Sequence, residues 1–235
     1  MRFKELIWRI PLAIVGGLVA LYAFPTESIW ILAPIVPAII LLATLGLGFW
    51  QASFVGFIAS QAFYIAHIEW IALYLGPVPL IALSTLMSFY FALGVGLTAW
   101  VYKKWRPKKL QLLTFALASA SIWTFREFLA NNFPYGGFPW SRLAMTQPGS
   151  FMNQWVYLGG LSLLSFMLAF FGSVLALWFL HRRGRNALSK LPALIALGSV
   201  VAVPLIILML NNPTPVGQKT IAAVQGNANA GLFSN

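Results

Sequence analysis

Uncharged apolar runs of about 20 residues recur along this chain, and they constrain its fold more than any other feature. Such a run is long enough to cross the hydrocarbon core of a bilayer as an α-helix. Charged residues make up only 8% of the chain, against about 25% in soluble domains. The runs do not alternate between apolar and polar residues, as the strands of a membrane β-barrel do. We therefore predict an all-α transmembrane bundle of about seven helices, with spans at about 10–24, 29–45, 49–66, 80–102, 110–129, 155–180 and 191–210.

The first span could also be a secretory signal peptide, because basic residues precede its apolar stretch. A signal peptide ends at a small-residue cleavage site. The exit from this span reads Ala23-Phe24-Pro25, which does not fit such a site. We predict a helix that the protein retains.

The distribution of basic residues predicts the orientation of the bundle. Twelve of the 15 lysines and arginines fall in the segments 2–9, 103–109 and 182–190, which alternate spans place on one side of the membrane. Short loops rich in Lys and Arg stay on the cytoplasmic side. The sequence therefore predicts a cytoplasmic N-terminus and an extracytoplasmic location for residues 211–235. Topology also explains the net charge of +11, so we expect no nucleic-acid partner.

The chain lacks several reactive residue types. It contains no Cys and no Asp, and its two histidines are His67 and His181. A Ser-His-Asp triad, a thiolate nucleophile and a His-rich metal cluster therefore cannot be built from these residues. We predict no metal site, no cofactor and no catalytic residue within this sequence.

The tail changes character after the seventh span. Residues 211–218 are polar and rich in Pro and Gly, which is typical of a linker. Residues 219–235 begin with a β-branched run closed by Gly226-Asn227, which indicates a short buried strand and a turn. One strand is not stable alone. We expect it to be the first strand of a truncated soluble domain, the alternative being a disordered polar tail.

Function is expected near the longest irregular extracytoplasmic segment, residues 131–142, which is dominated by aromatic residues, Pro and Gly. Arg142 could hydrogen-bond a lipid phosphate through two N–H groups. Arg126 and Glu127 stand near the end of the preceding span, and ionisable groups at membrane depth are often functional. Adjacent side chains point to different sides of a helix, so Glu127 could pair with Arg142 instead. His67 and Glu69 are expected at the interface.

Several short motifs, in order, resemble the apolipoprotein N-acyltransferase family over nearly the whole chain. They are Ala23-Phe24-Pro25 with Trp30, Glu69-Trp70, Trp123, Glu127-Phe128-Leu129, Gly137-Phe138-Pro139-Trp140, Gly159-Gly160 with Ser165-Phe166, and Val224-Gln225-Gly226-Asn227. The chain departs from the family in two places. The family commonly has Asn where Glu69 stands, and Gln147-Pro148-Gly149 only loosely follows the usual sequence.

The resemblance implies eight transmembrane helices in a bacterial inner membrane and a nitrilase-like domain facing the periplasm. The family moves an acyl chain from a phospholipid, through a catalytic Cys, to the α-amine of a diacylglyceryl-modified apolipoprotein, with a Glu as base and a Lys on the oxyanion. By resemblance those three residues lie after Asn235, so we expect this sequence to be the membrane portion of a longer enzyme. The resemblance favours Trp140 as a substrate contact, supported by Phe138, Pro139, Glu127 and Arg142.

Two other interpretations of the sequence stay open. One is an integral-membrane transporter, which would need polar groups near the bilayer midplane and related halves. The other is a membrane anchor without acyl-transfer chemistry. A sequence that continues with Glu, Lys and Cys in a nitrilase-like context would favour the acyltransferase over both.

Overall fold

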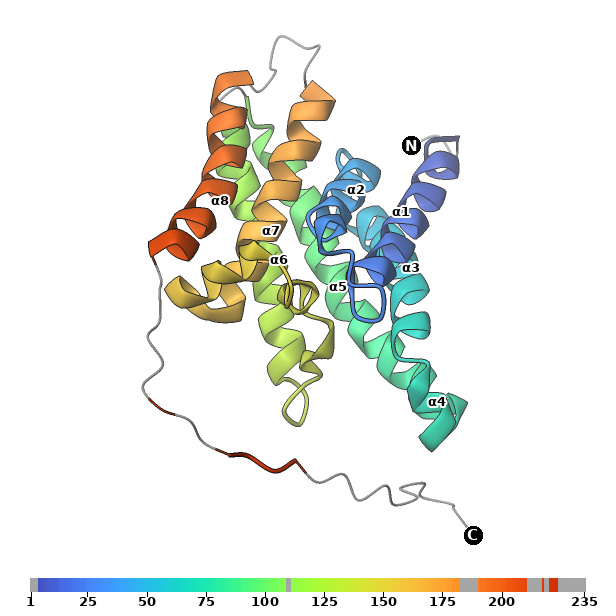
Figure 1. The fold of residues 1–235 in the computed structure, drawn as a ribbon. Coiled ribbons are helices and arrows are strands. Elements are labelled where there is room, and N and C mark those ends of the chain that lie inside the picture. Colours follow the sequence, from blue (N-terminus) through green and yellow to red (C-terminus); the bar gives the residue numbers. More distant parts are fainter. Residues whose placement is uncertain (1–3, 109–110, 182–189, 211–216, 218–219, 224–235) are drawn as a thin grey trace.

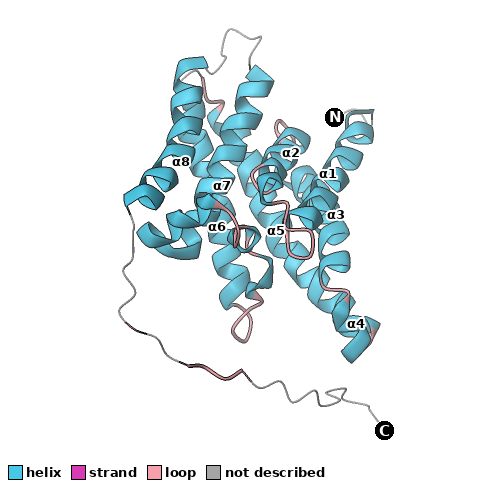
Figure 2. Ribbon diagram, in the orientation of Figure 1, coloured by secondary structure: helices cyan, strands magenta, loops and turns pink. Residues whose placement is uncertain are grey.

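The computed structural model of the chain describes residues 4–108, 111–181, 190–210, 217 and 220–223. Within these residues the fold consists of helices and loops without strands, as Figure 2 shows. The α-helices are α1 (Lys4–Ala23), α2 (Ile35–Thr44), α3 (Phe49–His67), α4 (Trp70–Leu75), α5 (Pro77–Trp105), α6 (Gln111–Asn132), α7 (Val156–His181) and α8 (Lys190–Leu210). Four short 3-10 helices accompany them: η1 (Trp30–Leu32), η2 (Pro139–Ser141), η3 (Leu143–Thr146) and η4 (Phe151–Trp155). The predicted all-α class is confirmed for the described residues.

Helices occur in all seven predicted spans. In the described part of the chain, five are long and apolar enough to cross a membrane: α1, α5, α6, α7 together with η4, and α8. The apolar helical stretch Trp30–Thr44, which includes α2, is shorter. The 19-residue α3 carries polar residues that turn inward: Ser60 is buried, and Gln61 Nε2 donates to Thr85 Oγ1 of α5 at 3.0 Å. The count of seven spans therefore stays a prediction.

Four of the predicted spans differ from the helices of the structure. The first helix includes Lys4, whereas the predicted span began at about residue 10. The fourth span begins at Pro77 rather than at about residue 80. Proline is tolerated in the first turn of a helix because its missing N–H would have no helical acceptor there. The predicted second span is broken into η1 and α2. The predicted sixth span is also not one helix, since Gly159 and Gly160 have non-helical φ of −163° and +65°. Figure 1 shows η4 and the first turn of α7 running across the bundle at an angle to the rest of α7.

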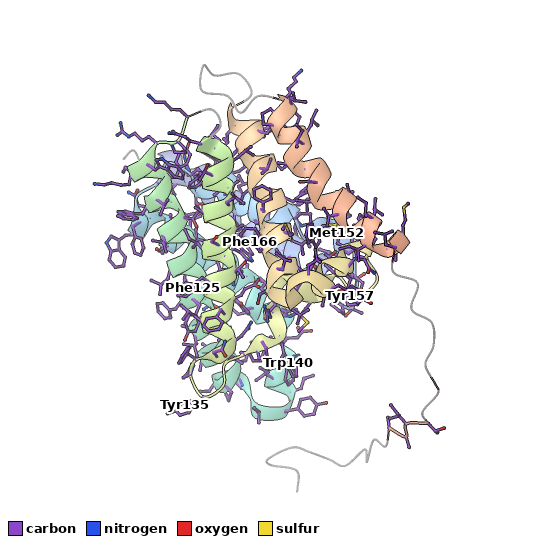
Figure 3. All side chains as sticks on the ribbon, turned by 90° about the vertical axis from the view of Figure 1, so that its left-hand side faces the viewer. Phe125, Tyr135, Trp140, Met152, Tyr157 and Phe166 are labelled. Carbon is purple, nitrogen blue, oxygen red and sulfur yellow. The ribbon has the colours of Figure 1, made fainter. Side chains whose placement is uncertain are left out.

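The two ends of the bundle differ in character (Figure 1). We call the end with the start of α1 and the last turn of α5 the basic end, because Lys103 and Lys104 lie there. We call the end with α4 and residues 133–142 the loop end. Figure 3 shows Tyr135 and Trp140 at the loop end.

The predicted tail falls mostly outside the described residues. Residues 220–223 have no regular secondary structure. The remainder of the predicted linker (211–218, apart from Gly217) and of the predicted strand (219–235) lies outside the described part. The strand and the domain it would begin stay predictions.

Candidate functional site

Glu127 is the centre of a buried polar cluster at the loop end. Its side chain is 2% exposed, although Phe125 and Phe128 of the same helix are exposed. Its Oε1 atom accepts hydrogen bonds from Trp123 Nε1 and from the backbone N–H of Leu143, each at 2.9 Å. Trp123 lies four residues earlier in α6, so the two side chains share one face of the helix. Glu127 therefore joins α6 to the chain segment that follows the Gly-Phe-Pro-Trp motif.

Two arginines flank this carboxylate. Arg126 Nη2 lies 3.7 Å from Glu127 Oε1, and Arg142 Nε lies 3.9 Å from Glu127 Oε2. Both distances allow ion pairing but exceed hydrogen-bond length. The sequence left the choice between the two arginines open, and the structure brings both to the same carboxylate. Arg142 Nη2 instead donates to Ser162 Oγ of α7 at 2.7 Å.

Arg126 is held in the bundle by aromatic rings. It is 7% exposed, and its guanidinium carbon lies 4.5 Å from the centroid of Phe91 and 4.3 Å from that of Trp123. Such cation–π contacts stabilise a cation that has lost its water. With two arginines and one carboxylate, the cluster carries a net positive charge when all three are ionised.

The cluster lines a small cavity of about 30 Å³ between α1, α2, α3, α5 and α6. Its polar lining includes Tyr64, Ser60 and Ser141 as well as Arg126 and Glu127. The cavity is too small for a lipid headgroup but has the volume of one or two water molecules. Glu127 and Arg126 thus line a space of water size, and the predicted contact of Glu127 with substrate stays a prediction.

The Gly-Phe-Pro-Trp motif forms a fixed turn rather than a loose loop. The Phe138 N–H donates to the carbonyl of Ala130 at 2.8 Å, which ties the motif to the last turns of α6. Gly137 has φ +70°, and a Cβ there would lie 2.2 Å from the backbone carbon of Asn131. Only glycine combines that conformation with so close an approach. Pro139 and Trp140 follow the turn as the first two residues of η2.

Trp140 is the middle residue of an aromatic cluster. Its ring centroid lies 5.0 Å from that of Trp70 and 5.7 Å from that of Phe138, with interplanar angles of 25° and 28°. Trp70 and Trp140 are still 37% and 55% exposed. Both line a groove of about 970 Å³ between the end of α1, the α3–α4 junction and residues 140–148. This groove is large enough for a headgroup or part of an acyl chain.

The five residues predicted for the site thus divide into two sets. Trp140 lines the groove, and Phe138 stacks against it. Pro139 is the first residue of the 3-10 helix η2. Glu127 and Arg142 belong to the buried cluster, and the short segment 140–143 connects the two sets. Sequence analysis named Trp70 in a family motif but did not pair it with Trp140.

Tyr64 and Ser162 are two further residues of the site that sequence analysis missed. Both are common polar residues in apolar helices, and no local pattern marks them. His67 and Glu69 were expected at the interface, and both line the groove. The His67 ring stacks on Phe63 at 4.7 Å. Among the described residues, no three His, Cys, Asp or Glu side chains lie together as metal ligands would.

The fold and the site together define a multi-pass helical membrane protein, in which a buried charged cluster supports an aromatic turn beside a groove. Residues 16–174 match the family described as the apolipoprotein N-acyltransferase N-terminal domain, a range that contains the cluster, the turn and the groove. The chain belongs to the apolipoprotein N-acyltransferase family.

Individual relatives support the same assignment. The chain is similar to the apolipoprotein N-acyltransferase of Vibrio vulnificus, with 27% identity over 245 residues that cover 98% of this chain and 45% of the relative. It is 31% identical over 196 residues to that of Pseudomonas putida, which covers 81% of this chain and 37% of the relative. The chain therefore spans less than half the length of the curated relatives it matches.

Proposed function

We propose that this chain is the membrane portion of an apolipoprotein N-acyltransferase that transfers an acyl chain from a phospholipid to the N-terminal diacylglyceryl-cysteine of an apolipoprotein. The observation that carries the proposal is the Trp70–Trp140 stack, which places an exposed aromatic surface in a groove walled by apolar helices. Both substrates are lipids, so a groove in the bilayer would orient them and supply proximity. The match of residues 16–174 to the N-terminal domain of this family favours the acyltransferase over the transporter and anchor interpretations.

In this proposal the groups that react are not among these 235 residues. The chain has no Cys to form a thioester, and the relatives are more than twice as long as the parts that match it. The bundle would hold a reactive domain against the membrane and admit lipids from the side. By itself, the 235-residue chain is expected to give no turnover of a diacylated lipopeptide.

The first prediction concerns Trp140. In the intact enzyme, Trp140→Ala should lower the rate of lipopeptide acylation on the order of tenfold, because an aromatic pair is worth about 0.5–1.5 kcal/mol and about 1.4 kcal/mol corresponds to a factor of ten. Trp140→Phe is the matched control, since it keeps a ring that can stack on Trp70. The measurement is the initial rate in phospholipid vesicles, together with the amount of enzyme inserted. An unchanged rate for Trp140→Ala would show that the groove takes no part in acyl transfer.

The second prediction concerns orientation. We propose that the basic end faces the cytoplasm and the loop end faces outward, which is supported by Lys103 and Lys104 in the last turn of α5. The chain has no Cys, so Lys104→Cys and Tyr135→Cys each add one thiol to it. A membrane-impermeant maleimide should label Tyr135→Cys in intact spheroplasts and Lys104→Cys only after lysis. The reverse pattern would contradict the orientation, and the unsubstituted protein gives the background.

A further inference from the structure

Helix α8 contains a proline in its interior, and the carbonyl that this proline leaves without a helical donor is paired from another element. Pro204 has no N–H, so it cannot donate to the carbonyl of Val200, four residues earlier. Val200 is 2% exposed, and an unpaired polar group in such a place is costly. Trp155 Nε1 donates to this carbonyl at 3.0 Å. One hydrogen bond therefore pairs two buried groups, the indole N–H and the carbonyl that the proline sets free.

The position of Trp155 depends on the break in α7. Trp155 is the last residue of η4, and α7 follows directly at Val156. Gly159 and Gly160 interrupt the helix, and the φ of +65° at Gly160 is one that glycine adopts readily. The residues before the break can therefore leave the axis of α7, and η4 lies against α8 (Figure 1). An unbroken α7 would not carry Trp155 to Val200.

Few side chains hold α8 in the bundle. Ala193, Val200 and Pro204 are its buried residues, whereas Met209 and Leu210 at its end are 77% and 80% exposed. A proline inside a helix also weakens the turn before it, because its ring crowds the carbonyl four residues earlier. The direction of the last turns of α8 therefore depends on how the turn from Val200 to Pro204 is held.

We propose that Trp155 is a positioning residue, whose hydrogen bond to the Val200 carbonyl fixes the direction of α8 at its proline. The consequence rests on the proposed function. Since α8 leads into the predicted linker 211–218, its direction would set where a following reactive domain stands relative to the groove at Trp140. Trp155 itself lines neither the groove nor the cavity at Glu127, so it would act through α8 and not by touching a substrate.

A double-mutant cycle tests the hydrogen bond. Trp155→Phe keeps a ring but removes the N–H, and Pro204→Ala gives the Val200 carbonyl a donor within the helix. We expect Trp155→Phe to raise the equilibrium constant for unfolding about tenfold, the scale of one buried carbonyl left unpaired. In the Pro204→Ala protein the same substitution should raise it less than about threefold, because the carbonyl keeps a partner. The measurement is SDS titration of the chain in mixed micelles. Trp50→Phe, at a position that is 79% exposed, is the matched control and should leave the constant unchanged.

A distance measurement tests the effect on α8. The chain has no Cys, so Phe125→Cys in α6 and Met209→Cys in α8 add two thiols for spin labels, both at exposed positions. Double electron–electron resonance in nanodiscs should give a narrow distance distribution, and Trp155→Phe should broaden it. In the Pro204→Ala protein, Trp155→Phe should not broaden it. A role in packing alone would broaden the distribution equally in both backgrounds.

The outcomes separate this inference from the proposed function. Equal effects of Trp155→Phe with and without Pro204→Ala would overturn the inference and leave the Trp140 prediction standing. If Trp155→Phe folds only together with Pro204→Ala, that rescue supports the hydrogen bond, and failure to fold in both backgrounds would overturn it. In the intact enzyme, Trp155→Phe should lower kcat and leave KM unchanged, because the groove keeps its lining. An unchanged kcat beside a broadened distribution would show that α8 does not position the reactive groups. An intact enzyme without acyl transfer would refute the proposed function, while the cycle and the distances would still decide the role of Trp155.

Discussion

Replacing Glu127 with alanine is expected to destabilise the bundle by about 3–5 kcal/mol, the usual cost of removing one partner from a buried ion pair. The substitution would leave Arg126, which is 7% exposed, without its nearby carboxylate. It would also remove the acceptor for Trp123 Nε1 and for the Leu143 N–H. The free energy of unfolding can be measured by SDS titration in mixed micelles, with far-UV circular dichroism as the signal.

Glu127→Gln separates the charge of this residue from its hydrogen bonds. The glutamine carbonyl can still accept from Trp123 and Leu143, so the turn that carries Trp140 should keep its position. The net charge of the cluster nevertheless rises by one. We expect Glu127→Gln to be less destabilised than Glu127→Ala, and in the intact enzyme to retain more acyl transfer per folded molecule. Equal stability of Glu127→Ala and wild type would show that the carboxylate does not hold the cluster together.

Composition and periodicity predict the helices well because lipid requires every backbone polar group in a span to be paired internally. That requirement acts on each segment separately, so a single sequence reveals it. The short helix α4 was missed because its six residues lie between two spans and end at Gly76, whose φ is +86°. The break in α7 at Gly159–Gly160 was also missed, since two glycines inside an apolar run are equally compatible with an unbroken helix.

The candidate site was predicted only in part, and the missing part depends on long-range contacts. The Gly-Phe-Pro-Trp motif and Glu127 drew attention through residue type alone. The stack of Trp70 on Trp140 joins residues 70 positions apart, and no local pattern encodes it. The contacts of Glu127 with Arg142 and with the Leu143 N–H form only when the turn packs against α6, so the local sequence does not reveal them either. Glu127 is buried against the turn, and its contact with substrate stays a prediction.

Substituting Gly17 with alanine is expected to push α1 away from α3. A Cβ at Gly17 would lie 2.1 Å from the carbonyl oxygen of Ala59 and 3.1 Å from its carbon, and backbone atoms cannot move aside as a side-chain tip can. Ala13 and Ala20 lie on the same face of α1 and are buried. Small residues of this kind let two membrane helices approach closely. Overpacking at such a contact costs about 1–3 kcal/mol or more, measured by the same SDS titration.

Gly198→Ala in α8 is the matched control for this substitution. Apart from its own helical turn, no atom lies within 4 Å of the position that its Cβ would occupy. The substitution should therefore not destabilise the protein, and the higher helix propensity of Ala should add up to about 1 kcal/mol. Gly17→Ala should also lower acyl transfer by the intact enzyme, because Leu18 and Leu21 of α1 line the groove and move with the helix. A Gly17→Ala protein as stable as Gly198→Ala would mean that α1 and α3 are not in van der Waals contact at this point.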